Sequence, residues 1–141
     1  MTLQTITTSQ LSLETTYELL AHARRTCAER GFAACVAITD AGGHLRVFER
    51  ADTAPFLTAG VAIDKAWTAA SYGMSTSQWN QYMSEPTVAP LAQHPRLTPV
   101  GGGVPIIVNG QLAGGIGISG GSSVQDHEAA EEALRAMNLI G

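Results

Sequence analysis

The sequence predicts an α/β (α+β) domain in which helices flank antiparallel β-hairpins. Two observations support this fold class. Apolar runs typical of strands occur in two pairs, each joined by a short turn that contains glycine. Segments with helical spacing and helix-capping residues stand before, between and after these pairs. A chain of 141 residues is long enough for one such domain with its own core.

The first part of the chain predicts a helix followed by a hairpin. Ser12 is suited to cap a helix over about 13–30, and Gly31 is suited to end it. Residues 32–39 form an apolar run, and residues 44–50 alternate between apolar and polar side chains. The turn sequence DAGG separates them, so an antiparallel pair of strands is expected here.

An alanine-rich segment, TAGVAIDKAWTAASYG, predicts a second long helix. Thr58 is its expected N-cap and Gly73 its expected end. The small side chains of this segment allow close approach to a sheet or to another subunit. Lys65 lies inside this apolar stretch, where burial would lower the pKa of its ammonium group unless a carboxylate pairs with it.

The remaining segments predict a second hairpin between two helices. A short helix is expected in STSQWNQYMSE, and residues 86–99 form a loop bounded by prolines. Asn109-Gly110 is typical of a tight hairpin turn between two strands. The last helix is expected over about 123–137.

Charge and composition exclude several classes of function. The formal net charge is −4 with only 8 Lys and Arg, which argues against a nucleic-acid partner. No apolar run reaches the length of a membrane helix, and the first residues lack the pattern of a signal peptide, so a cytoplasmic protein without a membrane partner is expected. Cys27 and Cys35 are expected to be reduced, buried thiols, and no metal site is predicted.

The stretch GIGISGG contains G-x-G-x-x-G in front of a predicted helix, the spacing of a dinucleotide-binding turn. That function needs a parallel βαβ unit with a second strand after the helix, and here the chain sequence ends after the helix. The glycines are therefore interpreted as places where a strand lies against another backbone, with Gly120-Gly121 as a sharp turn. Gly121 begins a helix N-terminus that could hold a carboxylate or phosphate, or could be capped by the chain itself.

Three segments in order resemble one known family. They are TDAGGHLRVFERADTAPFLTAGVAIDKAWTAA, GGGVPIIVNGQLAGGIGISGG and QDHEAA. The chain is identified by them as similar to the GlcG-like, HbpS-type haem-degrading or haem-binding family, which includes the C-terminal domain of some corrinoid adenosyltransferases. Family members often carry Asp-Gly-Ala where this chain has Asp52-Thr53-Ala54, which makes this turn less permissive.

The resemblance implies a fold, an assembly and a class of ligand. The expected fold is profilin-like, with an antiparallel sheet of about five strands flanked by helices, over residues 13–141 after a polar segment at 1–12. The resemblance also implies a homo-oligomer and a small-molecule ligand, with haem as the candidate cofactor.

As a binding protein, the chain would hold a flat apolar ligand such as haem, which needs an apolar slot, an axial ligand and partners for two propionates. His22 is on a helix face away from the main apolar stripe, and His44 and His127 are expected at the surface. The candidate ligand-binding residues are Arg50, Thr58, Tyr72, His94, Gly101, Gly102, Gly103 and Gly121.

As an alternative, the chain would be a cofactor-independent isomerase, tautomerase or hydrolase of a small aromatic or oxoacid metabolite. Lys65 or Asp126 would then move the proton as the catalytic residue. Arg50 or the helix start at Gly121 would hold a carboxylate, and Tyr72 or Trp67 would stack on the ring. A third alternative is a structural role in assembly, and a structural ion pair of Lys65 with Asp40, Asp52, Asp64 or Asp126 stays open.

Overall fold

Two hairpins build one antiparallel sheet in the computed structural model, which describes residues 2–141. Strands β1 (Cys35–Asp40) and β2 (Leu45–Arg50) form the first hairpin, and β3 (Gly103–Val108) and β4 (Gln111–Ser119) form the second. β1 pairs with β4, which gives the strand order β2-β1-β4-β3. The α+β class is confirmed, but the sheet described has four strands rather than about five.

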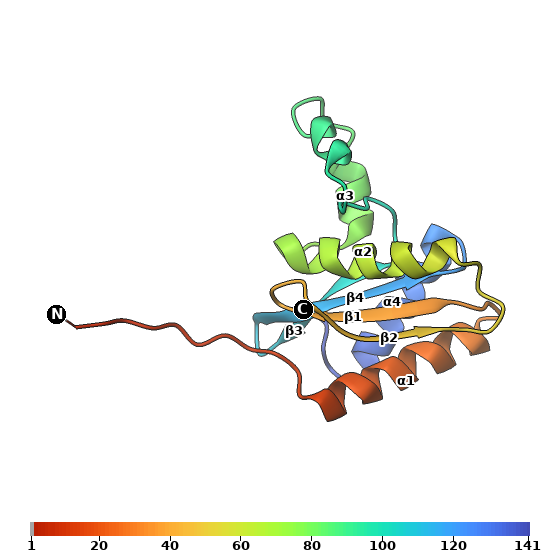
Figure 1. The fold of residues 1–141 in the computed structure, drawn as a ribbon, viewed down its shortest axis with the longest axis horizontal. Helices are drawn as coiled ribbons and strands as arrows, with labels where there is room; N and C mark the ends of the chain where they lie inside the picture. The colour runs from red at the N-terminus through yellow and green to blue at the C-terminus, as the bar shows by residue number, and fades with distance from the viewer. Residues whose placement is uncertain (1) are drawn as a thin grey trace.

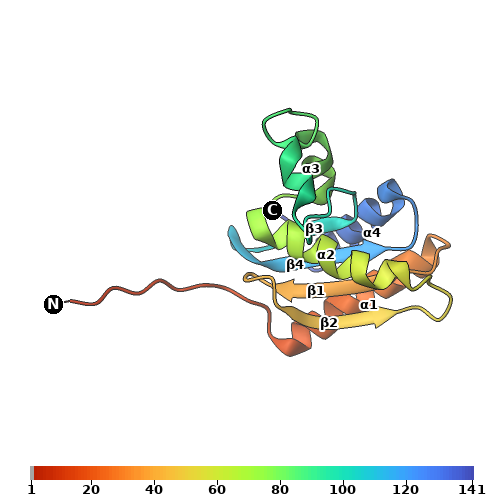
Figure 2. The same ribbon diagram turned by 45° about the horizontal axis from the view of Figure 1, so that its top comes forward.

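Helices cover the two faces of the sheet unequally (Figures 1 and 2). α1 (Leu13–Glu29) and α4 (Ser123–Ala136) pack together on one face, and α2 (Leu57–Tyr72) lies alone across the other. Side chains from β1 and β4 alternate between these faces. The larger core is on the α1/α4 side and includes Leu19, Ile38, Ile116, Ile118 and Leu134.

The core between α2 and the sheet is thin because its side chains are small. It consists of Cys35, Ala37, Ala54, Ala62 and Ala66. A Cβ atom added at Gly117 would collide with the carbonyl oxygen of Ala62, and one at Gly115 would collide with that of Ala66. The backbone of β4 therefore touches the backbone of α2, as expected for the glycines of GIGIS.

Local capping explains most helix ends. The side chain of Ser12 accepts a hydrogen bond from the Thr15 amide at 3.1 Å, and Gly73 ends α2 with a φ of +64°. Both predictions are confirmed. The prediction for Thr58 is wrong: α2 begins at Leu57 after Phe56, which makes no side-chain cap, and the Thr58 hydroxyl donates to the carbonyl oxygen of Pro55.

The segment between α2 and β3 projects away from the sheet (Figure 1). It contains α3 (Thr76–Tyr82) and the 3-10 helix η1 (Ala89–Gln93). The short helix predicted in STSQWNQYMSE is α3, which a capping box of Ser75 and Gln78 begins. Two parts of the molecule therefore extend away from the sheet: this projecting segment and the residues that precede α1.

The outer edge of β3 is occupied by parts of the chain outside the sheet. The Gly103 amide donates to Thr76 Oγ1 at 2.8 Å, and the Ile107 amide donates to the carbonyl oxygen of Leu139 at 2.8 Å. Between them stands Pro105, which has no amide hydrogen. Gly103, Pro105 and Ile107 alternate along the side of β3 that faces away from β4. Two of their backbone amides already donate hydrogen bonds and the third has no hydrogen, so this edge is protected against pairing with another strand.

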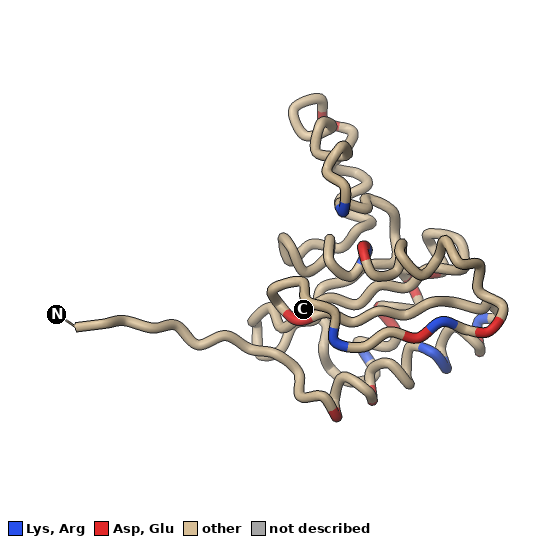
Figure 3. The backbone as a smooth tube through the Cα atoms, in the orientation of Figure 1, with Lys and Arg blue, Asp and Glu red and all other residues tan. Residues whose placement is uncertain are grey.

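Within residues 2–141, none of the helices combines the length and the apolar character that a membrane span requires. Cys27 and Cys35 are both free and buried, as predicted. Acidic and basic positions are interspersed over the molecule (Figure 3). The strand β2 contains Arg46, Glu49 and Arg50.

Candidate functional site

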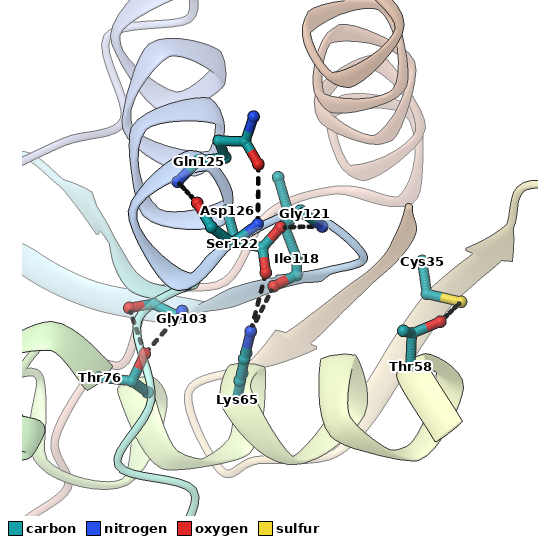
Figure 4. A network of polar contacts seen from close by, with 10 residues as sticks. All are labelled: Cys35, Thr58, Lys65, Thr76, Gly103, Ile118, Gly121, Ser122, Gln125 and Asp126. Atoms are coloured by element: carbon teal, nitrogen blue, oxygen red, sulfur yellow. Dashed lines mark hydrogen bonds and ion pairs between the residues drawn. The ribbon is translucent and has the colours of Figure 1, made fainter. Parts of the chain in front are cut away.

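The buried pair of Lys65 and Asp126 joins α2 to the first turn of α4. Lys65 Nζ donates to Asp126 Oδ2 at 3.2 Å and to the carbonyl oxygen of Ile118 at 3.0 Å. Both side chains are only 2% exposed. Figure 4 shows the ammonium group directed from α2 toward the carboxylate. Of the four acidic partners considered for Lys65, Asp126 is the one that the fold brings to it.

Several contacts compensate for the burial of the charges of Lys65 and Asp126. Burial lowers the pKa of Lys65, and the charge of Asp126 offsets part of that effect. Asp126 Oδ1 also accepts a hydrogen bond from the Gly121 amide at 2.9 Å. Each charged group therefore has an opposite charge and a further hydrogen bond, which is what a buried ion pair requires.

Protein groups fill the space beside this pair. Gly101, Gly102 and Gly103 are buried, and Gly102 has a φ of +134°. A Cβ atom at Gly102 would stand 2.8 Å from Lys65 Nζ and would collide with the carbonyl oxygen of Ile118. Gly102 and Gly103 thus pack on Lys65, and Gly101 packs on Ser77 and Ser123. The geometry favours the structural role of Lys65 and Asp126 over acid-base catalysis.

The start of α4 is capped by its own residues. The side chains of Ser122 and Gln125 form a capping box, with hydrogen bonds of 3.1 Å and 2.8 Å to the helix backbone. The Gly121 amide is held by Asp126, as Figure 4 shows. The chain itself therefore supplies acceptors at the helix start where a ligand carboxylate was considered.

Arg50 and Thr58 lie near one end of the sheet. Arg50 pairs with Cys35 across β2 and β1, and its Nη1 donates to the carbonyl oxygen of Ala54 at 3.1 Å. Thr58 Oγ1 lies 3.3 Å from Cys35 Sγ. These two predicted residues are brought together around Cys35, while Lys65 lies about two turns further along α2.

His94 fastens the projecting segment to α2. Its ring stacks on Trp67 with centroids 5.3 Å apart, and its Nδ1 accepts a hydrogen bond from the Arg96 amide at 3.1 Å. The Arg96 guanidinium lies 4.9 Å from the centre of the Trp67 ring and donates to Asp64 at 3.0 Å. This cation–π and ion-pair cluster gives His94 a positioning role in the loop.

Tyr72 stands apart from the other predicted ligand-binding residues. It is 71% exposed near the C-terminal end of α2 and contacts Trp79 edge to face at 5.8 Å. Thr58 lies near the opposite end of the same helix. The predicted set therefore divides into separate groups within residues 2–141.

A cleft of about 750 Å³ lies between α3, β3 and α4. We call it the α3–α4 cleft. Its volume is within the range of small-molecule sites. Apolar side chains of β3 and the C-terminal residues line one part, and polar groups of the two helices line the rest: Val104, Ile107 and Ile140, and Gln78, His127, Glu131 and Arg135.

His127 is the distinctive side chain of this cleft. It is 22% exposed, and its Nε2 lies 3.3 Å from Glu131 Oε1. Its Nδ1 is buried and has no hydrogen-bond partner within residues 2–141. Because Nδ1 is enclosed by protein atoms, Nε2 beside Glu131 is the ring nitrogen that a ligand in the cleft could reach. The described residues contain no group of three or more His, Cys, Asp or Glu that could hold a metal ion by themselves.

His127 was expected at the surface, and this expectation is corrected by its place in the cleft. The signal that could have found it is the spacing of His127, Glu131 and Arg135, which recur every fourth residue and share one helix face. That face adjoins the buried stripe of Ala130, Ala133 and Leu134. A polar row beside an apolar stripe marks a helix that borders a cleft.

Comparison with known proteins agrees with this architecture. The sequence model of the family described as "Haem degrading protein HbpS-like" matches residues 11–135. The chain belongs to this HbpS-like family. Its membership confirms the resemblance carried by the three sequence segments.

Relatives of this HbpS-like chain include proteins of other descriptions. Protein GlcG of Escherichia coli K12 is 30% identical over 109 residues, which cover 77% of this chain and 81% of GlcG. The corrinoid adenosyltransferase PduO of Citrobacter freundii is 32% identical over 133 residues, which cover 92% of this chain and 39% of PduO. A crystal structure described as a PduOC:heme complex is similar with a TM-score of 0.83 and 29% identity, over 92% of this chain and 96% of that one.

Proposed function

We propose that this chain is a homo-oligomeric small-molecule-binding protein that takes haem in the α3–α4 cleft. The observation that carries the proposal is His127, an imidazole 22% exposed in a cleft of about 750 Å³, with its Nε2 beside Glu131. The family description and the haem complex of a similar protein support the choice of ligand.

The cleft offers groups that would contact the ring, the iron and one of the two propionates of haem. Val104, Ile107 and Ile140 give an apolar surface for the flat ring. His127 is the candidate axial ligand. Arg135, whose side chain is 62% exposed, lies at the same cleft and offers a cation for a propionate.

Glu131 has two functions in this arrangement. Its carboxylate lies 3.3 Å from His127 Nε2 and 3.6 Å from Arg135 Nη2. This contact would hold the His127 ring in the cleft, and the iron would take the place of Glu131 at Nε2, because Nδ1 is enclosed by protein atoms. Bound haem would supply an iron centre for one-electron or oxygen chemistry, and the residues of this chain would hold and orient it.

Haemin titration tests the proposal. We expect a saturable shift of the Soret band for the wild-type chain and its loss or displacement in the His127→Ala variant, because the axial ligand is removed. The matched control is His44→Ala, since His44 is 81% exposed, does not line the α3–α4 cleft, and has its ring paired with Asp40. An unshifted Soret band in the wild-type chain, or equal spectra for His127→Ala and His44→Ala, would contradict the proposal.

A further inference from the structure

A second cavity, of about 320 Å³, opens where the C-terminal end of α1 meets β1 and β2. We call it the α1 pocket. Residues from α1, the following connection and both strands line it, chiefly Arg24, Cys27, Ala28, Phe32, Val36 and Glu49. None of them lines the α3–α4 cleft. The two cavities are therefore separate parts of the molecule.

Small side chains make this pocket hollow. Ala28 and Ala51 stand on its walls, and Cys27 and Val36, at 3% and 2% exposure, belong to the main core. Phe32 is partly buried against the same core and presents an aromatic side chain to the space. Because the surrounding helix and strands are fixed by that core, the hollow is a preformed feature of the fold.

The interior of the α1 pocket carries no charge at neutral pH. Burial, with a smaller contribution from the charge of Asp126, raises the pKa of the Cys27 thiol to about 12, so the thiol keeps its proton. The two charged groups stand together: Arg24 Nη1 donates to Glu49 Oε2 at 3.3 Å, with side chains 59% and 33% exposed. Their charges cancel, and the exposed guanidinium has further donors for a ligand oxygen.

We propose that the α1 pocket binds a small uncharged aromatic molecule of one or two rings. An apolar cavity of about 150 Å³ is enough to hold benzene, and this pocket has roughly twice that volume. The apolar walls exclude an ionised ligand, since burying its charge without a partner is unfavourable. Arg24 at the rim offers further donors to molecules that also carry a hydroxyl or carbonyl group.

Isothermal titration with indole, a neutral two-ring probe, tests this site. We expect wild-type protein to bind indole and the Ala28→Leu variant to bind it at least tenfold more weakly, because the larger side chain fills the pocket. Ala28 is exposed and leucine is a good helix former, so the variant keeps its fold. The control is Ala136→Leu, an exposed alanine of α4 that lines neither cavity.

A thiol reaction locates the bound probe. In a Cys35→Ser background, Cys27 is the remaining cysteine of the sequence. Cys27 is 3% exposed, so N-ethylmaleimide reacts with it only when the pocket opens, and indole is expected to slow this reaction at least threefold because it stabilises the closed form. No heat of binding at millimolar indole, equal affinity in Ala28→Leu, or an unchanged alkylation rate would each overturn the proposal. Haemin binding is measured separately through the Soret band, so either proposal can fail alone.

Discussion

Two buried titratable side chains connect folding to pH in opposite directions. Burial lowers the pKa of Lys65, so the unfolded chain binds that proton more strongly and stability gains as pH rises toward 10.5. Burial raises the pKa of Cys27 from 9.0 to about 12, so the folded chain keeps a proton that the unfolded chain loses. The stability that Cys27 contributes is complete below pH 9 and is lost as pH rises from 9 to 12.

Comparison of cysteine variants isolates this contribution. We expect the free energy of unfolding of the wild-type chain to fall relative to that of Cys27→Ala above pH 9, by up to about 1.4 kcal/mol per pH unit. Urea denaturation between pH 8 and 11 measures the difference, and Lys65 cancels because both chains contain it. The Cys35→Ala variant retains Cys27, so its free energy of unfolding should also fall above pH 9 relative to that of Cys27→Ala. A difference that does not change with pH would show that the thiol titrates alike in both states.

At the residue scale, the sequence indicated that Lys65 needs an acidic partner but did not show which acidic residue that partner is. An ammonium in an apolar helix demands a carboxylate, and that demand is visible from its neighbours in the sequence. Asp126, however, lies 61 positions away, and its proximity depends on how α4 packs beside α2 and β4. His127 was missed for the same reason, because its cleft exists only after α3 folds opposite α4.

At the scale of elements, the contact of α2 with β4 depends on glycines, which have no side chain to separate the two backbones. Gly115 and Gly117 let the strand approach the carbonyl groups of Ala66 and Ala62. Gly60, by contrast, has no heavy atom within 4 Å of the position of an added Cβ and is exposed on α2. The same substitution is therefore expected to have opposite effects at two glycines.

Alanine substitutions at these two positions test the packing of α2. Gly117→Ala should lower the free energy of unfolding by about 1–3 kcal/mol or more. The added methyl group would meet backbone atoms of α2, which cannot move aside as a side chain can. Gly60→Ala should raise it by about 0.4–1 kcal/mol, because alanine restricts the unfolded chain and favours helix. Thermal and urea unfolding measure both changes. Destabilisation by Gly60→Ala, or tolerance of Gly117→Ala, would mean that α2 is placed differently.

Elements with local signals were predicted well. Ser12, Gly31 and Gly73 mark helix ends, and Asn109 and Gly110 adopt the positive φ angles that a tight hairpin turn requires. The start of α2 was assigned wrongly to Thr58 because a hydroxyl near a helix start is as compatible with the first turn as with the cap. The expectation of about five strands came from the family resemblance, and the sheet within residues 2–141 has four.

At the scale of the whole molecule, the two edges of the sheet differ. The β3 edge is protected by Thr76, Pro105 and Leu139, whereas β2 forms the opposite edge. Phe48 lies in the middle of β2 and is 36% exposed. An open edge with an exposed aromatic side chain is a suitable surface for a second copy. The proposed homo-oligomer is therefore expected to use β2.

Measurement of mass in solution tests this interface. Light scattering after gel filtration should give a multiple of the 14.7 kDa chain for the wild type and a smaller mass for Phe48→Lys. The control is Tyr17→Lys, which introduces the same charge at a side chain 55% exposed on α1. A monomeric wild type, or a Phe48→Lys variant of unchanged mass, would exclude the β2 edge as the interface.

The occupied margin of β3 also limits how far copies can add to one another. A filament built by strand addition needs two unpaired sheet edges on every copy, so that each added copy offers a free edge to the next. Here Pro105 and the bonds to Thr76 and Leu139 remove one of the two. If two copies join through β2 as proposed, they use up the other edge, and strand addition is expected to stop at a pair of sheets.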